Sequence, residues 1–181
     1  MNIDGQILLW IQENLRNPVL NVILGSITHL GDAGIIWIIL AAILLIFKKT
    51  RKVGVCTSFA LISTLLVNEL FLKHLIDRAR PIEVVSGLTT VVPTPDSGSF
   101  PSGHSASSFA AVFVLLMLAP KKYSIPSLIF GIVIALSRLY VGVHFPTDVI
   151  GGILMGTLYG LAGYRLGTYL YNRRGKKTVS V

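Results

Sequence analysis

Charged residues are scarce in this chain. Only 13% of its 181 residues are Asp, Glu, Lys or Arg, whereas a soluble domain usually carries about a quarter. Apolar residues make up 52% of the chain, and a soluble protein this short has too little interior to bury them all. The composition therefore excludes a soluble enzyme and a disordered chain, and it predicts an integral membrane protein with spans of about 20 residues each.

Cysteine and acidic residues are also few. Cys56 is the only cysteine, which excludes an intramolecular disulfide and a disulfide-stapled secreted module. The net charge of +8 is explained by basic cytoplasmic loops of a membrane protein, so we expect no nucleic-acid partner. Residues 1–4 include no basic stretch and no clear cleavage site, so we expect no signal peptide.

The apolar runs predict an all-α fold, a polytopic membrane bundle of five or six transmembrane helices with an N-terminal interfacial helix. Residues 3–16 alternate apolar and polar at helical spacing, which is typical of a helix lying in the membrane interface. Residues 19–30 are apolar but short, and favour either a tilted short helix or a re-entrant one. The further expected spans are 35–47, 53–72, 105–119, 125–143 and 149–171, with a polar loop over 81–100.

Positive charge is concentrated in three places along the chain. Ten of the sixteen Lys and Arg residues are Lys48, Lys49, Arg51 and Lys52, then Lys121 and Lys122, then Arg173, Arg174, Lys176 and Lys177. The span count puts all three segments on one face, which the positive-inside rule makes cytoplasmic. The C-terminus is then cytoplasmic, and residues 73–103 and 144–148 face outside.

The outer face should be poor in positive charge, yet it carries three cations close together in sequence, Lys73, Arg78 and Arg80, and a fourth, Arg138, shortly before the outer segment 144–148. Lys73 and Arg80 are seven residues apart, which is about two helical turns and places them on one face. Ionisable groups at such positions are usually functional, so the cluster indicates an anionic ligand. The alternatives are solvated charges, or a pair between Lys73 and Asp77 four residues later.

Two further segments hold titratable groups at predicted helix starts. Ser102 can cap a helix, and Gly103 lets backbone N–H groups approach an anion beside His104. Pro146 suits the first position of the last helix, so Asp148 in its first turn could accept a hydrogen bond from His144 and leave the other ring nitrogen as a nucleophile. Two histidines and a carboxylate also suit a metal, although the neighbouring cations would repel one.

Together the three segments resemble the signature of the type 2 phosphatidic acid phosphatase superfamily of integral membrane lipid phosphatases. That signature is Lys-x6-Arg-Pro, then Pro-Ser-Gly-His, then Ser-Arg-x5-His-x3-Asp. Here it reads Lys73 to Arg80-Pro81, Pro101 to His104, and Ser137-Arg138 to His144 and Asp148. Every position and every internal spacing is met. We expect one domain over 1–181, with interfacial or short helices over 1–30 and the catalytic signature over 73–148.

The resemblance implies a role for each matched residue. The phosphate would be bound by Lys73, Arg80, Ser102, Gly103 and Arg138. His144 would attack phosphorus and become phosphohistidine, and Asp148 would orient it. His104 would protonate the leaving oxygen and then activate water. The resemblance implies neither a metal nor another cofactor, because the cations stabilise the transferring group.

The implied substrate is a lipid phosphate or diphosphate in the cell membrane. Because the site is expected to face outside, we predict hydrolysis of undecaprenyl diphosphate to undecaprenyl phosphate and phosphate at that interface. Phosphatidylglycerophosphate and phosphatidic acid suit the same residues. A lipid phosphotransferase and a small anion transporter are the alternatives from other classes, and the residues do not indicate an oligomeric state.

Overall fold

The computed structural model describes the backbone of residues 3–177 and the side chains of residues 3–173. This part of the chain is helical and contains no strand, which confirms the predicted all-α fold. Its α-helices are α1 Ile3–Asn14, α2 Pro18–Leu30, α3 Ile35–Ile46, α4 Arg51–Ser63, α5 Lys73–Ile76, α6 Pro81–Val84, α7 Gly103–Leu118, α8 Lys121–Tyr140 and α9 Pro146–Lys177. A 3-10 turn, Asp32–Gly34, precedes α3, and a π-helical segment, Thr64–Leu72, joins α4 to α5.

Three helical stretches are long and apolar enough to cross a membrane: Arg51–Val84, Lys121–Tyr140 and Pro146–Arg173. A fourth candidate is the pair Pro18–Leu30 and Asp32–Ile46, which is bent by 44° at the break between them. The described residues thus hold three or four candidate spans. The predicted number of five or six is not confirmed, because α2 and α3 form one bent pair and α7 has only 16 residues.

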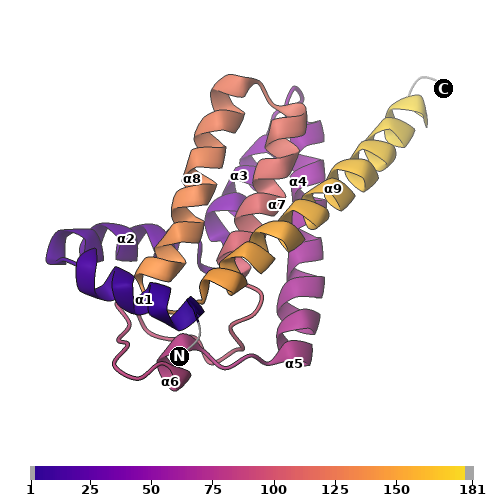
Figure 1. Ribbon diagram of the computed structural model, residues 1–181. Coiled ribbons are helices and arrows are strands. Elements are labelled where there is room, and N and C mark those ends of the chain that lie inside the picture. The colour runs from indigo at the N-terminus through magenta and orange to yellow at the C-terminus, as the bar shows by residue number, and fades with distance from the viewer. Residues whose placement is uncertain (1–2, 178–181) are drawn as a thin grey trace.

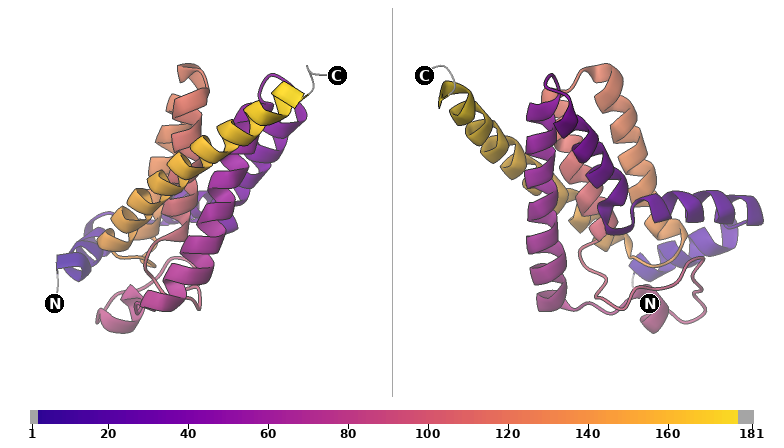
Figure 2. Two further views of the ribbon diagram at one scale, coloured as in Figure 1. Left: turned by 90° about the vertical axis from the view of Figure 1, so that its right-hand side faces the viewer. Right: turned by 180° about the vertical axis from the view of Figure 1, so that it is seen from behind.

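The longer helices lie side by side as a bundle, while α1 and α2 project from one flank near its lower end (Figure 1). α9 crosses the bundle obliquely and packs against both α7 and α4 (Figure 2). Glycines make this crossing close, because small residues let helix backbones approach each other. Gly156 leaves no room for a Cβ atom against the backbone of Ala106, and Gly163 leaves none against Ala60.

The bundle core is apolar and contains one buried indole. Trp37 is almost fully buried, and its Nε1 donates a hydrogen bond of 2.9 Å to the hydroxyl of Ser108. A buried indole N–H needs such a partner. Packing, rather than contact with lipid, is therefore the role of this tryptophan.

The two ends of the bundle differ in charge. The α3–α4 loop, the α7–α8 loop and the C-terminal end of α9 lie together at the upper end in Figure 1, whereas α5, α6 and the polar loop after them lie at the lower end. The three basic segments therefore share one end, as their spacing along the chain predicts. Of the C-terminal segment, the side chains of Arg174, Lys176 and Lys177 lie outside the described residues.

Candidate active site

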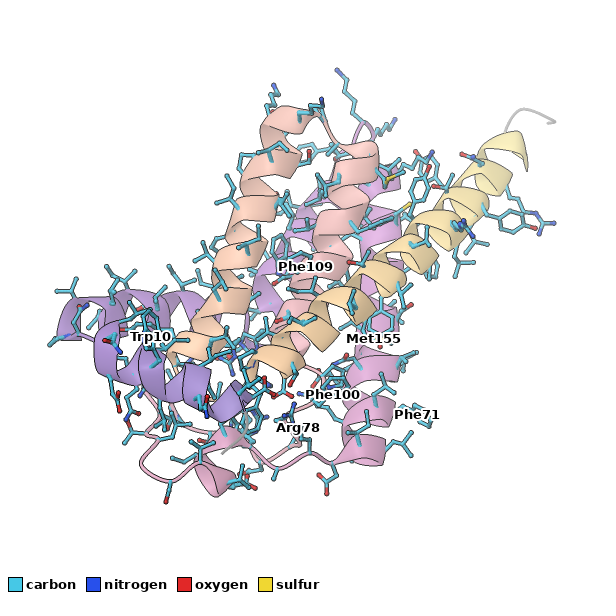
Figure 3. The ribbon with its side chains drawn as sticks, in the orientation of Figure 1. Trp10, Phe71, Arg78, Phe100, Phe109 and Met155 are labelled. Carbon is cyan, nitrogen blue, oxygen red and sulfur yellow. The ribbon has the colours of Figure 1, made fainter. Side chains whose placement is uncertain are left out.

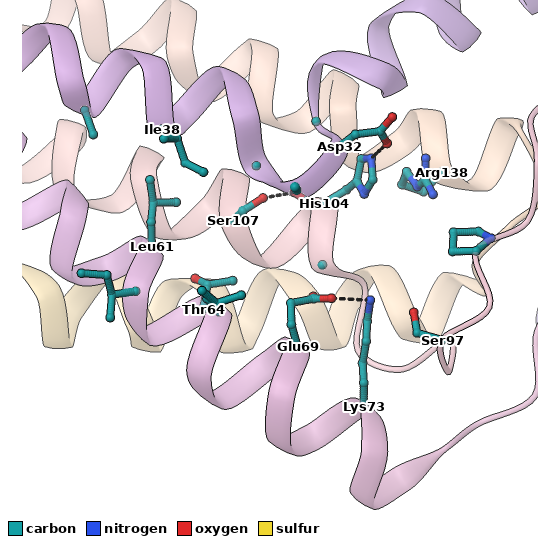
Figure 4. Close-up of a pocket in the computed structure, with 18 of the residues that line it drawn as sticks. Asp32, Ile38, Leu61, Thr64, Glu69, Lys73, Ser97, His104, Ser107 and Arg138 are labelled. Carbon is teal, nitrogen blue, oxygen red and sulfur yellow. Dashed lines mark hydrogen bonds and ion pairs between the residues drawn. The ribbon is translucent and has the colours of Figure 1, made fainter.

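The three signature segments converge on one cavity of about 750 Å³ at the lower end of the bundle (Figure 4). Six of the eight residues predicted for the site line this cavity: Lys73, Arg80, Gly103, His104, Arg138 and His144. Ser102 and Asp148 do not line it, and both are fully buried behind its wall. Residues up to 75 positions apart in the chain are thus brought to one place by α5, α7, α8 and the start of α9.

Lys73 reaches the cavity from the end of the π-helical segment. Its backbone N–H donates to the carbonyl of Asn68, five residues earlier, and wide turns of this kind are frequent at functional sites. Its ammonium lies 2.7 Å from a carboxylate oxygen of Glu69. The suggested pairing with Asp77 is not found, because the backbone of Asp77 is left-handed (φ 41°) and the helix ends there.

Arg80 is 1% exposed and forms its shortest hydrogen bonds with the backbone. Its Nε donates to the carbonyl of Ser97 and its Nη1 to the carbonyl of Val143, each at 2.9 Å. The guanidinium therefore joins the polar loop to the residue before His144. A buried cation held by neutral carbonyls keeps its full charge for an anionic ligand.

Arg138 is also buried, but its bonding is incomplete. Its Nη1 donates to the hydroxyl of Thr28 at 2.6 Å. Its Nε is buried and has no hydrogen-bond partner among the described residues. Because a buried donor is rarely left unpaired, this N–H is available to an oxygen atom of a ligand in the cavity.

Arg78 departs from the prediction that it joins the other cations around a ligand. It does not line the cavity. Its guanidinium instead forms ion pairs with Asp148 and Asp4, and it lies over the ring of Phe145 at 4.2 Å from the centroid. The prediction was wrong because Asp4, its partner, is far away in sequence and is brought close only by the docking of α1.

His144 and Asp148 form the predicted pair at the start of α9. Pro146 occupies the first position of that helix, and the Nδ1 atom of His144 lies 3.6 Å from Oδ2 of Asp148. This distance is longer than a hydrogen bond, and such contacts often shorten only when substrate binds. The same Oδ2 accepts the backbone N–H of Phe145 at 2.8 Å, so the carboxylate is fixed in place.

Burial lowers the pKa of His144 from 6.5 to about 4, and the charges of Arg138 and Arg80 act in the same direction against the opposing effect of Asp148. The imidazole is therefore neutral at pH 7. A neutral ring with one nitrogen directed at a carboxylate has its other nitrogen free to act as a nucleophile.

His104 is held by the turn between α2 and α3, which carries no signature residue. Its Nε2 lies 3.0 Å from Oδ1 of Asp32 and 3.1 Å from the carbonyl of Thr28. Both partners are acceptors, so Nε2 carries the proton and Nδ1 is the basic atom. Gly31 lies so close to the imidazole that any side chain there would displace the ring. Asp32 also lies 2.8 Å from His29.

Sequence reasoning missed Thr28 and Asp32 as parts of the site. Gly31 and Asp32 form the turn between α2 and α3. Nothing in the local pattern indicates that this turn packs against the start of α7, because that contact depends on the 44° bend between α2 and α3. His29 is more than half exposed and pairs with Asp32.

Ser102 and Gly103 begin α7 as predicted. The hydroxyl of Ser102 accepts the backbone N–H of Ser105 at 3.5 Å, which is the geometry of a helix N-cap. A Cβ atom on Gly103 would overlap the carboxylate of Glu69. A side chain at this position would therefore displace the carboxylate that pairs with Lys73.

The alternative of a metal site finds no supporting cluster in the structure. Among the residues whose side chains are described, no three His, Cys, Asp or Glu side chains gather as they do around a metal ion. His104 and His144 each face a different carboxylate, Asp32 and Asp148.

The PAP2 superfamily profile matches residues 53–172 of this chain, which includes all three signature segments. The chain belongs to the PAP2 superfamily. It is 36% identical over 122 residues to an undecaprenyl-diphosphatase of Sulfolobus acidocaldarius, a match covering 67% of this chain and 59% of that protein. It is 29% identical over 155 residues to undecaprenyl-diphosphatase BcrC of Bacillus subtilis, covering 86% of this chain and 79% of that protein.

A solved structure resembles the whole PAP2 fold described above. The PAP2-type phosphatidylglycerolphosphate phosphatase of Bacillus subtilis aligns with a TM-score of 0.73 and 28% identity, over 92% of this chain and 85% of its own. The family match and the phosphatase names of these relatives support a lipid phosphatase of the hydrolase class. The apolar helices and the membrane relatives indicate a membrane protein.

The lowered pKa of His144 predicts how acid affects stability. In the unfolded chain this histidine binds a proton near pH 6.5, whereas in the folded protein it does so only near pH 4. The free energy of unfolding is therefore unaffected by this histidine above pH 6.5. It decreases as the pH falls from 6.5 toward 4, by at most about 1.4 kcal/mol per pH unit, because the unfolded chain binds the proton more tightly. Thermal unfolding of wild type and His144→Asn in detergent at pH 7.5, 6 and 5 measures this. Wild type should lose more stability on acidification, and equal losses would contradict the prediction.

Proposed function

We propose that this PAP2 superfamily member hydrolyses undecaprenyl diphosphate to undecaprenyl phosphate and phosphate through a phosphohistidine intermediate. The observation that carries the proposal is the shape of the cavity, which joins the cationic residues to an apolar groove between α3 and α4 (Figure 4). One cavity thus offers space for a phosphate at one end and for a hydrocarbon chain at the other.

The groove is apolar along most of its length. Its walls are Ile38, Ala41, Ala42 and Leu45 from α3, Leu61 and Ile62 from α4, and Leu65 from the π-helical segment. Ile38, Ile62 and Leu65 are about half exposed, so the groove is open along the side of the bundle that lipid covers. A chain with a phosphate head can therefore reach the cavity from within the bilayer, and the small side chains of α3 leave room for it.

The chemistry assigned to the site has two steps. In the first, the neutral imidazole of His144 attacks phosphorus and the bond from phosphorus to the leaving oxygen breaks. His104 enters this step protonated on both ring nitrogens and gives that oxygen the proton of Nδ1, while Nε2 keeps the proton that faces Asp32. In the second, His104 takes a proton from water, whose oxygen attacks the phosphohistidine and releases phosphate. Lys73, Arg80 and Arg138, with the backbone N–H of Gly103, stabilise the transferring phosphoryl group. Ser102 supports them from behind the cavity wall, where its own N–H donates to the carbonyl of Asp148.

The choice of a polyprenyl diphosphate is supported by the names of two relatives. Charge alone does not support it. Arg78 is turned away from the cavity, and two carboxylates, Asp32 and Glu69, line the cavity together with the three cations. The competing substrate is phosphatidylglycerophosphate, which the similar solved structure is named for.

The charges at the two ends of the bundle support one orientation in the membrane. The basic segments share the end opposite the catalytic residues, so the positive-inside rule supports an active site at the outer interface and a cytoplasmic C-terminus. An outer site suits a diphosphate that is released at that face.

The nucleophile is tested by replacing His144. His144→Ala should lower kcat by about 10³-fold or more, because no other group can accept the phosphoryl group. His74→Ala, an exposed histidine of α5, is the matched control and should keep full activity. Phosphate release from detergent-solubilised substrate measures both variants, and near-normal activity of His144→Ala would rule out the mechanism.

The substrate is tested by comparing three lipids at the same surface concentration. We expect polyprenyl diphosphate to be hydrolysed with a higher kcat/KM than phosphatidylglycerophosphate or phosphatidic acid. Ala42→Trp should reduce turnover of all three, because the indole would fill the groove through which each chain enters. A clear preference for phosphatidylglycerophosphate would contradict the assignment of polyprenyl diphosphate as the substrate, but it would not contradict the proposed phosphatase mechanism.

The orientation is tested by labelling single cysteines in a Cys56→Ser background. Ser86 in the polar loop and Lys121 at the start of α8 are both exposed and lie at opposite ends of the bundle. Ser86→Cys should react with an impermeant maleimide added to intact cells, and Lys121→Cys should react only after lysis. The reverse pattern would place the active site in the cytoplasm.

A further inference from the structure

Arg78 lies at the centre of a set of contacts that runs from α1 to the catalytic pair. Its Nη1 donates to Oδ1 of Asp148 and, at 2.7 Å, to the hydroxyl of Thr147. Its Nη2 donates to Oδ2 of Asp4 at 3.0 Å. The Thr147 hydroxyl also donates to that oxygen of Asp4, so α1 and the start of α9 are tied to the same guanidinium. Figure 3 shows Arg78 at the lower end of the bundle, beside α1.

Asp148 depends on these contacts, because its carboxylate is fully buried. One oxygen is bound by Arg78, and the other accepts the N–H of Phe145 and faces His144. A buried carboxylate remains ionised and fixed only where such donors surround it. Removing the guanidinium would leave Asp148 with a single backbone donor.

Arg78 is placed to hold Asp148 and not to bind phosphate. It does not line the cavity that contains Lys73, Arg80 and Arg138. Both of its terminal nitrogens already donate to carboxylates. Its planar group also packs over the ring of Phe145, which limits its freedom to rotate toward the cavity.

α1 supplies the second carboxylate from a helix with two different faces. Leu8 is fully buried in an apolar cluster with Val85, Leu88 and Phe145. Ile3 and Trp10 on the same helix are exposed and suit contact with the membrane interface. The docking of Leu8 onto Phe145 therefore sets the position of Asp4 beside Arg78.

We propose that Asp4 and Arg78 are positioning residues for the nucleophile. Asp4 holds Arg78, Arg78 holds Asp148, and Asp148 orients His144. The interfacial helix α1 is then part of the catalytic apparatus, although none of its residues reaches the cavity. This proposal rests on the proposed phosphatase function.

The test is a double-mutant cycle on purified full-length protein, with a polyprenyl diphosphate as substrate and inorganic phosphate as competitive inhibitor. Arg78→Gln should lower kcat by about 10- to 100-fold, the range for groups that orient a catalytic ligand. Asp4→Asn should lower it by about 10-fold, and Asp4→Glu should restore most of the activity. Glu13→Gln removes an exposed charge from the same helix and is the matched control.

Three results together support the chain of contacts. KM and the inhibition constant of phosphate stay within about twofold of wild type, because Arg78 touches no substrate. Asp4→Asn has no further effect in the Arg78→Gln background, since both act through one group. The variants keep the melting temperature of Glu13→Gln to within a few degrees.

Other outcomes overturn the proposal. A rise in KM and in the phosphate inhibition constant in Arg78→Gln would make Arg78 a phosphate ligand. Additive losses in the double variant, or full kcat in Asp4→Asn, would separate α1 from the catalytic pair. If Arg78→Gln does not fold, the comparison of kcat between Asp4→Asn and Asp4→Glu tests the proposal instead. Equal kcat in these two variants would overturn it. Failure of the phosphatase proposal is distinct, because wild type itself would then release no phosphate.

Discussion

Buried positive charge at one end of an apolar bundle is the constraint on which the rest of this structure depends. Lys73, Arg80 and Arg138 are all nearly inaccessible to solvent, and unpartnered buried cations are strongly unfavourable. The chain provides oxygen atoms from distant segments instead of water. Carbonyls of the polar loop and of the turn before α9 surround Arg80, and the hydroxyl at the end of α2 binds Arg138. The need to solvate the buried cations therefore constrains the positions of these segments.

Neutral oxygens solvate a guanidinium without cancelling its charge. Among the described residues, Glu69 is the carboxylate that pairs with one of the three cations, and Arg80 and Arg138 form no ion pair. A phosphoryl group in transfer spreads negative charge over its equatorial oxygens. Fixed cations stabilise that charge without reorganising solvent, which is how the proposed reaction would proceed with side chains alone.

Much of the site could be predicted from the sequence, because its residues are placed by local structure. Ser102 and Pro146 start helices, and helix starts position His104 and Asp148 through short-range geometry. The fold class followed from composition and from the length of the apolar runs. The number of spans did not, since a run of apolar residues does not reveal the bend between α2 and α3.

The errors and omissions share one physical cause, which is contact between segments far apart in sequence. Arg78 was placed with the phosphate because it is close to Lys73 and Arg80 along the chain, but its partner Asp4 arrives with α1. Asp32 reaches His104 across 72 positions. The π-helical segment that turns Lys73 toward Glu69 has no sequence pattern of its own. Tertiary packing decides all three.

The groove between α3 and α4 has a kinetic consequence. Because it is open toward lipid along its side, a substrate chain can slide in while remaining in the plane of the bilayer, and only the released phosphate leaves for water. The encounter between protein and lipid is then a search in two dimensions. Its frequency depends on the mole fraction of the substrate among the surrounding lipids, so diluting the membrane with inert lipid slows the reaction while diluting the buffer does not.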